Sequence, residues 1–414
     1  MKKTIIRRSI ISLFLFSSLL ISCKKDPSAP LPTDPVPITL TTDQVSMISS
    51  ENTFALDLFK KVVENSGVAG NVIISPLSIS SALSMTVNGA NGSTREAMLE
   101  ALRQNGTTPE IINNSYKDLT DALLRVDQRV LISIANSVWT ENNFVVKNPF
   151  RDILTQYYNA DAKSFDVTDP KVPGLVNTWI ESKTNGLIKN MIDQLDPNTV
   201  MLLINAIYFK GKWTYQFDKG STVTGAFHKS DGAAVNVPMM KQSTDLKIYK
   251  GDGFSMAEFP YGQGNFVMDV ILPDDKNGAY SPFPVITDTS LKGWIAVMNK
   301  AKIDVTFPRF KYGFKKELKD ILSDMGMGIA FSDFADFSNI SDLPTKLSFV
   351  LHQAFIETNE EGTEAAAATI VGVVQTVAVL PVTFNMDHPF LYLIRETSTN
   401  SILFMGRVSD PSAN

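Results

Sequence analysis

A ten-residue run near the middle of the chain, residues 200–209 (VMLLINAIYF), is apolar at every position except Asn205. This pattern predicts a central β-strand that is covered on both faces. A chain that contains such a strand must place further layers on both sides of a sheet, because neither face of the strand can be left in water.

Further strands and amphipathic helices are predicted around this run. Strand patterns recur at residues 130–139, 266–272, 303–307, 390–395 and 401–408. Residues 53–64 have helical spacing, and Ser93 with Glu96 three residues later forms a capping box that predicts a helix over residues 94–104. No second linker, low-complexity tract or internal repeat interrupts residues 42–411. The pattern predicts one sheet-rich α+β domain and does not by itself predict a function.

The composition excludes several classes of function. The net charge is −5 and no basic stripe is interleaved with aromatic residues, so nothing indicates a nucleic-acid partner. The only cysteine is Cys23, which excludes a disulfide within the chain and any CxxC site. The three histidines, His228, His352 and His388, have no metal-ligand spacing, and there is no GxSxG elbow. We therefore expect no metal, no other cofactor and no hydrolase activity, and we predict that the protein is not an enzyme.

The amino terminus has the features of an export signal. Four basic residues precede an apolar stretch at residues 10–21, which is too short to span a bilayer comfortably. The stretch ends in the sequence LISC, which resembles a bacterial lipobox, and this resemblance implies cleavage after residue 22 and lipidation of Cys23. Residues 24–38 contain five prolines, which favour an extended spacer that does not join the core. We expect a signal peptide at residues 1–22 and a lipidated, proline-rich linker at residues 23–41.

These features predict an exported protein that is lipid-anchored to a bacterial envelope, in the outer membrane, and touches the membrane only through the anchor. The sequence leaves open whether the protein faces the periplasm or the surface. An ordinary secretory signal with a cysteine near its end is the alternative. The pair Arg7-Arg8 is compatible with twin-arginine export, although the basic region of any signal explains it equally well.

An eighteen-residue segment near the carboxyl terminus, residues 363–380 (TEAAAATIVGVVQTVAVL), has a single charge and no proline. In a strand, its alternate positions from Thr363 to Val373 would share one face made only of small or β-branched side chains. Such a face can enter a packed sheet without steric conflict, and Gly362 just before it can act as a hinge. From the residues alone, an Ala-rich helix and a plain core strand remain alternatives, although Gly372 weakens the helix and eighteen residues are long for a strand.

Five stretches of the chain resemble the serpin family and follow that family's order. Residues 360–369 (EEGTEAAAAT) are similar to the hinge of inhibitory serpins, and residues 71–79 (NVIISPLSI) resemble the second-helix motif of the family. Residues 205–213 (NAIYFKGKW) resemble its central-sheet motif, and residues 385–390 (NMDHPF) and 404–408 (FMGRV) its carboxy-terminal signature. The similarity spans roughly 370 residues. The chain is identified as a serpin of the inhibitory type in a bacterial lipoprotein form.

The resemblance implies a serpin domain at residues 42–411, with three β-sheets, eight to nine helices and an exposed reactive loop at about residues 360–381. It also implies that a target protease cleaves this loop and forms an acyl-enzyme. The loop then inserts as a new strand in the main sheet and traps the enzyme. The hinge residues would be Glu360, Glu361, Gly362, Thr363, Glu364, Ala365, Ala366, Ala367, Ala368 and Thr369, and we expect Thr363 to be exposed or only partly buried before cleavage.

The family register places the scissile bond at Thr376-Val377, with Gln375 or Val377 as alternative specificity residues. None of residues 374–379 is basic or aromatic. Small and β-branched side chains suit elastase-like or subtilisin-like pockets and leave a trypsin-like acidic pocket unpaired. The implied partner of this monomer is a serine protease, and the sequence leaves open whether cysteine proteases are also trapped.

Two further groups of residues take their roles from the resemblance. The hydrogen-bonded shutter beneath the main sheet would be formed by Ser75, Ser78, Asn205 and His352. A salt bridge between Arg309 and Glu360, beside Trp213, would form the breach where the loop first inserts. The alternative function is that of a non-inhibitory carrier or chaperone, which predicts bulky or charged residues on the inward face of the hinge.

Overall fold

The computed structural model describes residues 34–67, 70–275, 286–363 and 381–413. The described α-helices are α1 (Thr42–Asn65), α2 (Pro76–Val87), α3 (Gly92–Ala101), α4 (Pro109–Leu123), α5 (Asn148–Tyr158), α6 (Val172–Lys183), α7 (Asp288–Val297) and α8 (Lys319–Leu322). The strands are β1 (Val72–Ile74), β2 (Val130–Glu141), β3 (Asp161–Phe165), β4 (Met201–Lys212), β5 (Val223–His228), β6 (Ala234–Lys250), β7 (Phe254–Tyr261), β8 (Phe266–Pro273), β9 (Asn299–Pro308), β10 (Phe310–Glu317), β11 (Leu351–Asn359), β12 (Gly362–Thr363), β13 (Val382–Asn385), β14 (Phe390–Glu396) and β15 (Ile402–Val408).

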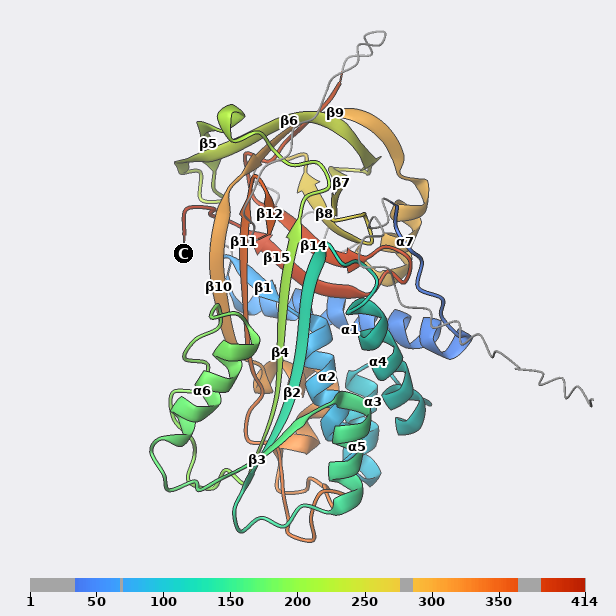
Figure 1. Cartoon of the computed structure of the whole chain (residues 1–414), viewed down its shortest axis with the longest axis vertical. Coiled ribbons are helices and arrows are strands. Elements are labelled where there is room, and N and C mark those ends of the chain that lie inside the picture. Colours follow the sequence, from blue (N-terminus) through green and yellow to red (C-terminus); the bar gives the residue numbers. More distant parts are fainter. Residues whose placement is uncertain (1–33, 68–69, 276–285, 364–380, 414) are drawn as a thin grey trace, which may run out of the picture. The chain divides into compact units, whose positions relative to one another are not determined.

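The apolar run at residues 200–209 forms most of β4, and both of its faces are covered, as predicted. Leu202, Ile204 and Ala206 pack in a small core against α6, whereas Ile207 and Phe209 belong to the main core. Side chains alternate between the two faces of a strand, so a continuous apolar run is needed to serve both cores. Figure 1 shows β4 beside β2, with α2 behind them and α6 to their left.

A six-stranded sheet contains β4 and has the strand order β10-β11-β12-β4-β2-β3. Strands β2 and β4 are antiparallel over their whole length, with Asn136 opposite Asn205. On the other side, β10 pairs with β11 along eight ladder positions. The two-residue strand β12 lies between these two halves of the sheet.

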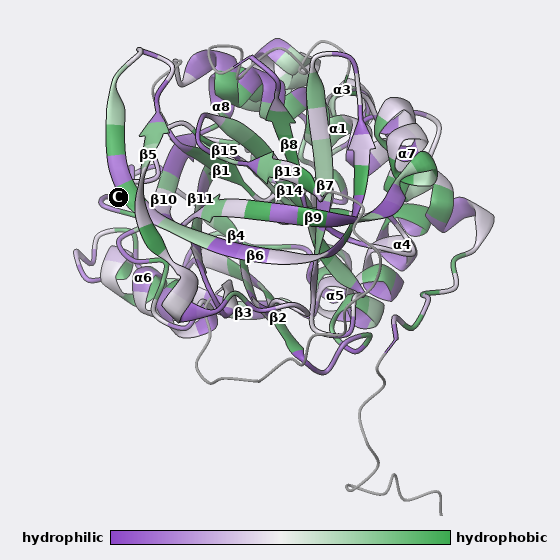
Figure 2. Ribbon diagram, turned by 90° about the horizontal axis from the view of Figure 1, so that it is seen from above, coloured by the Kyte–Doolittle hydropathy of each residue, from purple (hydrophilic) through white to green (hydrophobic). Residues whose placement is uncertain are grey.

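A nine-stranded sheet holds the remaining strands, in the order β1-β15-β14-β8-β7-β6-β9-β13 with β5 paired to β6. Strand β6 is 17 residues long and pairs with β5, β9 and β7 along successive parts of its length. The expected second and third sheets are therefore continuous through β6. Figures 1 and 2 show β6 and β9 side by side across the ends of the other strands. The predicted fold class is confirmed, because the described residues form an α+β architecture with eight α-helices.

The start of α3 differs from the prediction. The helix begins at Gly92 with Asn91 at the N-cap position and no side-chain cap bond, so the capping box proposed at Ser93 is wrong. The backbone N–H of Asn91 donates to the carbonyl oxygen of Asp336, 2.9 Å away. This long-range contact fixes the turn into the helix two residues earlier than the local sequence pattern indicates.

The last residues of the proline-rich linker lie against the body of the protein. The buried side chain of Asn265 binds both backbone groups of Val36, accepting from its N–H at 2.9 Å and donating to its carbonyl at 2.7 Å. The N–H of Ile38 donates to Ser398 Oγ at 2.9 Å. Residues 34–41 are thus part of the folded unit, whereas the sequence predicted that the spacer runs to residue 41.

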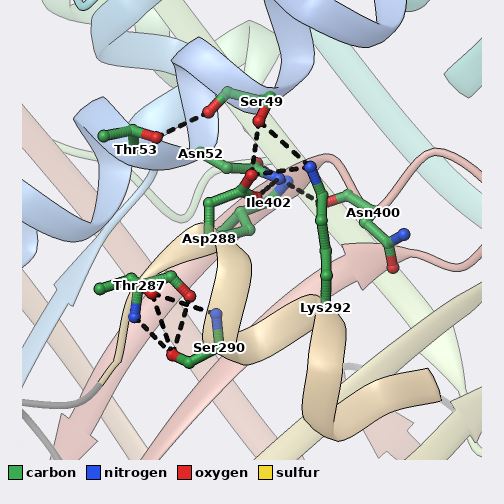
Figure 3. A network of polar contacts seen from close by, with 9 residues as sticks. All are labelled: Ser49, Asn52, Thr53, Thr287, Asp288, Ser290, Lys292, Asn400 and Ile402. Carbon is green, nitrogen blue, oxygen red and sulfur yellow. Dashed lines mark hydrogen bonds and ion pairs between the residues drawn. The ribbon is translucent and has the colours of Figure 1, made fainter.

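Helix α7 is fixed to α1 and to the turn before β15 by a polar network (Figure 3). Asp288, in the first turn of α7, accepts hydrogen bonds from Ser49 Oγ (2.5 Å), Asn52 Nδ2 (3.1 Å) and Lys292 Nζ (2.7 Å). Asn52 also donates to the carbonyl oxygen of Asn400 at 2.9 Å. A carboxylate at a helix N-terminus is favoured by the helix dipole, so the network stabilises α7 as well as its docking.

Candidate functional site

The start of the hinge is already paired within the six-stranded sheet. Thr363 lies opposite Thr358 of β11 and Gly211 of β4, and Gly362 lies opposite Asn359 and Lys212. The rest of the hinge, the reactive bond and the lipidation site lie outside the described residues: Glu364, Ala365, Ala366, Ala367, Ala368, Thr369, Thr376, Val377 and Cys23.

Only glycine fits at position 362. The φ angle of Gly362 is +144°, and a Cβ atom there would lie 2.1 Å from the carbonyl oxygen of Gly211 and 2.6 Å from Cα of Lys212. Both neighbours are backbone atoms of β4, which cannot move without disturbing the sheet. The glycine therefore permits the close approach of the hinge to β4, in addition to any role in flexibility.

Thr363 is anchored by a buried hydrogen bond. Its Oγ1 lies 2.9 Å from the hydroxyl oxygen of Tyr261, and the Tyr261 ring stacks on Trp213 with centroids 4.4 Å apart. Burial raises the pKa of Tyr261 far above its ordinary value, so the phenol is neutral. Thr363 is only 5% exposed, so the expectation that it is exposed or only partly buried before cleavage is wrong.

The predicted breach residues come together at the same place. Glu360 Oε1 receives three contacts. Arg309 Nε donates to it at 2.8 Å, and Arg309 Nη2 forms an ion pair with it. Thr222 Oγ1 also donates to it, at 2.5 Å. Burial acts to raise the pKa of Glu360, but the hydrogen bonds from Arg309 and Thr222 outweigh it and hold the pKa below its ordinary value. Trp213 Nε1 donates to the carbonyl oxygen of Asn359 at 3.0 Å, next to this carboxylate.

Glu361 is the second buried carboxylate of the breach. Its Oε1 forms an ion pair with Lys219, and its backbone carbonyl accepts from the N–H of Trp213 at 2.9 Å. The carbonyl of Glu360 accepts from the N–H of Phe217, also at 2.9 Å. The two residues before Gly362 are therefore held by side chain and backbone alike, and they set the position of β12.

Beyond β12 the two halves of the sheet are not joined to each other. Among the described residues, β4 and β11 each pair with β12 but share no ladder pair of their own. Residues 201–210 of β4 and 351–357 of β11 thus present facing edges without a common ladder. We call the region between these edges the slot; its β4 edge is ten residues long, roughly 33 Å, and its β11 edge is seven residues long, roughly 23 Å.

Three of the predicted shutter residues form one hydrogen-bonded group at the lower part of this slot. Ser75 caps α2, and its Oγ donates to the carbonyl oxygen of Leu403 at 2.7 Å. Ser78 Oγ donates to Asn205 Oδ1, which joins α2 to β4. Ser75, Ser78 and Asn205 are thus brought together, because the N–H of Ser78 also donates to Ser75 Oγ.

His352, the fourth predicted shutter residue, lies at the start of β11. Its Nε2 accepts the backbone N–H of Ser75 at 3.1 Å. Burial lowers the pKa of His352 to about 3, so the ring is neutral near neutral pH. Because Nε2 is the acceptor, the ring proton lies on Nδ1.

The sequence did not predict that Asn136 and Tyr158 belong to the same group. Asn136 Oδ1 accepts from Asn205 Nδ2 at 2.7 Å, and Asn136 Nδ2 donates to the carbonyl oxygen of Tyr158 at 2.7 Å. The hydroxyl of Tyr158 donates to Asn113 Oδ1 at 2.8 Å and extends the network into α4. The sequence signal that could have indicated this was Asn136 itself, because it is a polar residue inside the apolar strand pattern predicted at residues 130–139.

Other kinds of site find no support in the described part of the chain. It contains no group of three or more His, Cys, Asp or Glu side chains placed to hold a metal ion. None of its helices is long and apolar enough to cross a membrane.

Comparison with known proteins assigns the family. Residues 49–411 match the family model "Serpin (serine protease inhibitor)". The chain belongs to the serpin family. A serine protease inhibitor of Cyanea capillata is 35% identical over 356 residues, covering 84% of this chain and 94% of that serpin. Serpin B6 of Pongo abelii is 34% identical over 375 residues, covering 88% of this chain and 99% of its own length.

Solved serpin structures have the same fold. The thermophilic serpin tengpin in its native state is 30% identical, with a TM-score of 0.82, and the match covers 91% of this chain and 97% of tengpin. Human thyroxine-binding globulin in complex with its ligand is 28% identical, also with a TM-score of 0.82, over 90% of this chain and all of the globulin. The fold is thus shared by a serine protease inhibitor and by a thyroxine-binding globulin.

Proposed function

We propose that this serpin is an irreversible, suicide-substrate inhibitor of serine-type endopeptidases with elastase-like or subtilisin-like specificity. The observation that carries the proposal is the position of β12. Gly362 and Thr363 already occupy the slot between β4 and β11, and the two strands share no ladder pair beyond them among the described residues. A strand that continued from Thr363 would pair with both edges.

This geometry and the chemistry of serine proteases support the following mechanism. The protease attacks the reactive bond, proposed at Thr376-Val377, and forms an acyl-enzyme with the residue before that bond. Cleavage frees the loop at one end, and the loop then enters the slot, gaining a ladder on each side. Each backbone hydrogen bond contributes about 0.5–1.5 kcal/mol, so a strand of about ten residues supplies a large driving force for moving the attached protease.

The hinge side chains favour inhibition over the carrier function. The inward positions Thr363, Ala365 and Ala367 are small, so their burial needs no rearrangement of the strands. A carrier with the same fold does not need this property. The uncharged residues 374–379 suit apolar specificity pockets.

Formation of a covalent complex tests the proposal. Protein beginning at Thr33, which keeps the docked residues 34–41, is mixed with pancreatic elastase and with subtilisin, and we expect an adduct that survives boiling in SDS. Protease whose active-site serine has been blocked with a sulfonyl fluoride is the control and gives no adduct. Cleavage within residues 374–379 without any stable adduct, across a wide set of serine and cysteine proteases, would disprove inhibition.

We also propose that Cys23 is lipidated and anchors the protein to the bacterial envelope. A diacylated cysteine supplies two acyl chains, whereas a single chain gives only marginal binding. Cys23→Ser should release the protein from the membrane fraction and abolish labelling by a palmitate analogue, while Ser22→Ala should leave both unchanged. Label that persists in the serine variant would refute lipidation at this residue.

A further inference from the structure

A cavity lies at the lower end of the slot. It has a volume of about 290 Å³ and is bordered by α2, by the first residues of β4 and by the chain that leads into β11. Its lining is largely apolar and includes Ile79, Leu83, Leu202 and Phe349. A volume of this size is close to the lower end of the range found for sites that bind small organic molecules.

One polar group in the wall of this cavity has an unused hydrogen-bonding capacity. His352 lines the cavity and is only 4% exposed to solvent. Its Nε2 is occupied by the N–H of Ser75, and its Nδ1–H has no hydrogen-bond partner within the described ranges. Nδ1 is not among the completely buried side-chain atoms that lack a partner, so this donor keeps accessible surface and can bond a molecule placed in the cavity.

Apart from Ser348, which is exposed to solvent, the other polar side chains of the wall are already bonded. Ser78 Oγ donates to Asn205 Oδ1, and Asn205 Nδ2 donates to Asn136. Lys346, which also borders the cavity, forms an ion pair with Asp333. The cavity thus combines apolar walls with one available donor at His352.

We propose that this cavity is a binding site for an uncharged, apolar small molecule of about ten or more non-hydrogen atoms that carries one carbonyl-type oxygen. The oxygen accepts the hydrogen bond of His352 Nδ1–H, and the hydrocarbon part fills the space between α2 and β4. A charged ligand is disfavoured, because no free counter-charge faces it in the wall and burying an unpaired charge is expensive.

The site also implies a means of regulation, which rests on the proposed inhibitory function. Continuing the register of Thr363 opposite Gly211 sets residues 369–373 of an inserting strand opposite residues 205–201 of β4. These residues of β4 border the cavity. The ligand therefore competes with the last part of insertion, and its binding diverts the inhibitor towards simple cleavage.

Histidine-selective NMR tests the site directly, because the chain has only three histidines. The probe is 4-phenyl-2-butanone, and its control is 2-methyl-4-phenyl-1-butene, in which a methylene group replaces the carbonyl oxygen. With ¹⁵N-histidine protein we expect saturable shifts of the His352 ring nitrogens only. His388, whose ring nitrogens contact Asp387 and Pro273 at 2.8 and 2.7 Å, and His228 serve as internal references. The alkene should bind about tenfold more weakly, since it cannot accept the hydrogen bond.

A variant that fills the cavity separates binding from folding. Ala82 of α2 borders the cavity, whereas Ala122 of α4 does not, and both are partly exposed. Ala82→Phe should weaken binding of the ketone at least tenfold, and Ala122→Phe should leave it unchanged. Absence of saturable His352 shifts in the wild type, or undiminished binding to Ala82→Phe, would overturn the site.

The regulatory step has its own readout. Saturating ketone should raise the number of inhibitor molecules consumed per protease trapped, and it should not do so in Ala82→Phe. If the ketone binds but the stoichiometry stays the same, the competition is refuted while the proposed inhibitory function stands. If no protease is trapped even without ketone, the inhibitory function fails while the NMR result still decides the site.

Discussion

Replacing Thr363 by arginine tests the hinge most sharply. Thr363 is buried between β11 and β4, and its Oγ1 lies 2.9 Å from the hydroxyl of Tyr261. An arginine side chain at this position has no acidic partner in the contacts described for Thr363. Its guanidinium cannot stay between the strands without losing its hydration.

The size of the effect follows from the contacts that are lost. A buried Tyr261 hydroxyl left without its partner costs about 1–3 kcal/mol. Burying an unpaired guanidinium costs several kcal/mol more. The least costly response is for β12 to leave the sheet and give up its ladder with Asn359 and Lys212. We therefore expect the uncleaved variant to lose stability, by roughly 1–3 kcal/mol, since the native site is already buried.

The same change should convert the inhibitor into a substrate. Position 363 lies about thirteen residues before the proposed reactive bond, so cleavage itself is unaffected, whereas insertion must continue from this residue. An added barrier of about 3 kcal/mol slows insertion more than a hundredfold. Hydrolysis of the acyl-enzyme then precedes insertion, and the protease is released.

The assay is a titration of active protease by inhibitor, together with SDS gels of the products. Thr363→Ser keeps the hydroxyl and a small side chain and should trap protease as the wild type does. Scanning calorimetry adds a second readout, because cleavage should raise the thermal midpoint of the kinetically trapped wild type sharply and that of the arginine variant less. An arginine variant that traps protease at the wild-type stoichiometry would refute the proposed role of the hinge.

Two further predictions concern stability. Burial lowers the pKa of His352 to about 3. Between pH 6.5 and 3, His352 is therefore protonated in the unfolded chain but remains neutral in the native state. The stability from this group is complete above pH 6.5 and falls with pH, by about 2 kcal/mol at pH 5. Burial raises the pKa of Asp269, and this shift stabilises the native state as the pH falls, in the opposite direction. The measurement is therefore the difference in the free energy of unfolding between wild type and His352→Gln, obtained in urea at pH 7 and at pH 5. A difference that is independent of pH would contradict the prediction. Asn265→Ala removes the hydrogen bonds to both backbone groups of Val36. This variant should have a free energy of unfolding that is lower by about 1–3 kcal/mol, and its residues 34–41 should become accessible to proteases. Removal of residues 1–32 alone is the control and should have neither effect.

The central strand and the order of elements were predictable, because they depend on local patterns. The apolar run of β4 needs cover on both faces whatever surrounds it, and α6 and α2 supply that cover. The capping box at Ser93 failed for the opposite reason. Its sequence pattern is local, but the helix start is fixed by the bond from Asn91 to Asp336, a residue far along the chain.

The candidate site was predictable only where the resemblance to the serpin family supplied the residues, as it also did for Arg309 and His352. Ser75, Ser78 and Asn205 lie in motifs that resemble the serpin family, and the structure brings them together. Tyr261 lies in no such motif, and its bond to Thr363 joins residues that are 102 positions apart. Asn265 and Val36 are 229 positions apart, so no local pattern predicts that the end of the linker is hydrogen-bonded to Asn265.

Under the proposed mechanism, the arrangement at the breach helps insertion to compete with hydrolysis of the acyl-enzyme. The slowest part of adding a strand is the first pairing, in which backbone entropy is lost before many hydrogen bonds have formed. Here that step is complete before cleavage, because Glu360 and Glu361 are held by Arg309 and Lys219 and Gly362 lies against β4. Fixing two residues costs about 1–2 kcal/mol each, so starting from β12 removes roughly 2–4 kcal/mol from the barrier. That is about 30-fold to 1,000-fold in rate, which is enough to decide whether the protease is trapped or released.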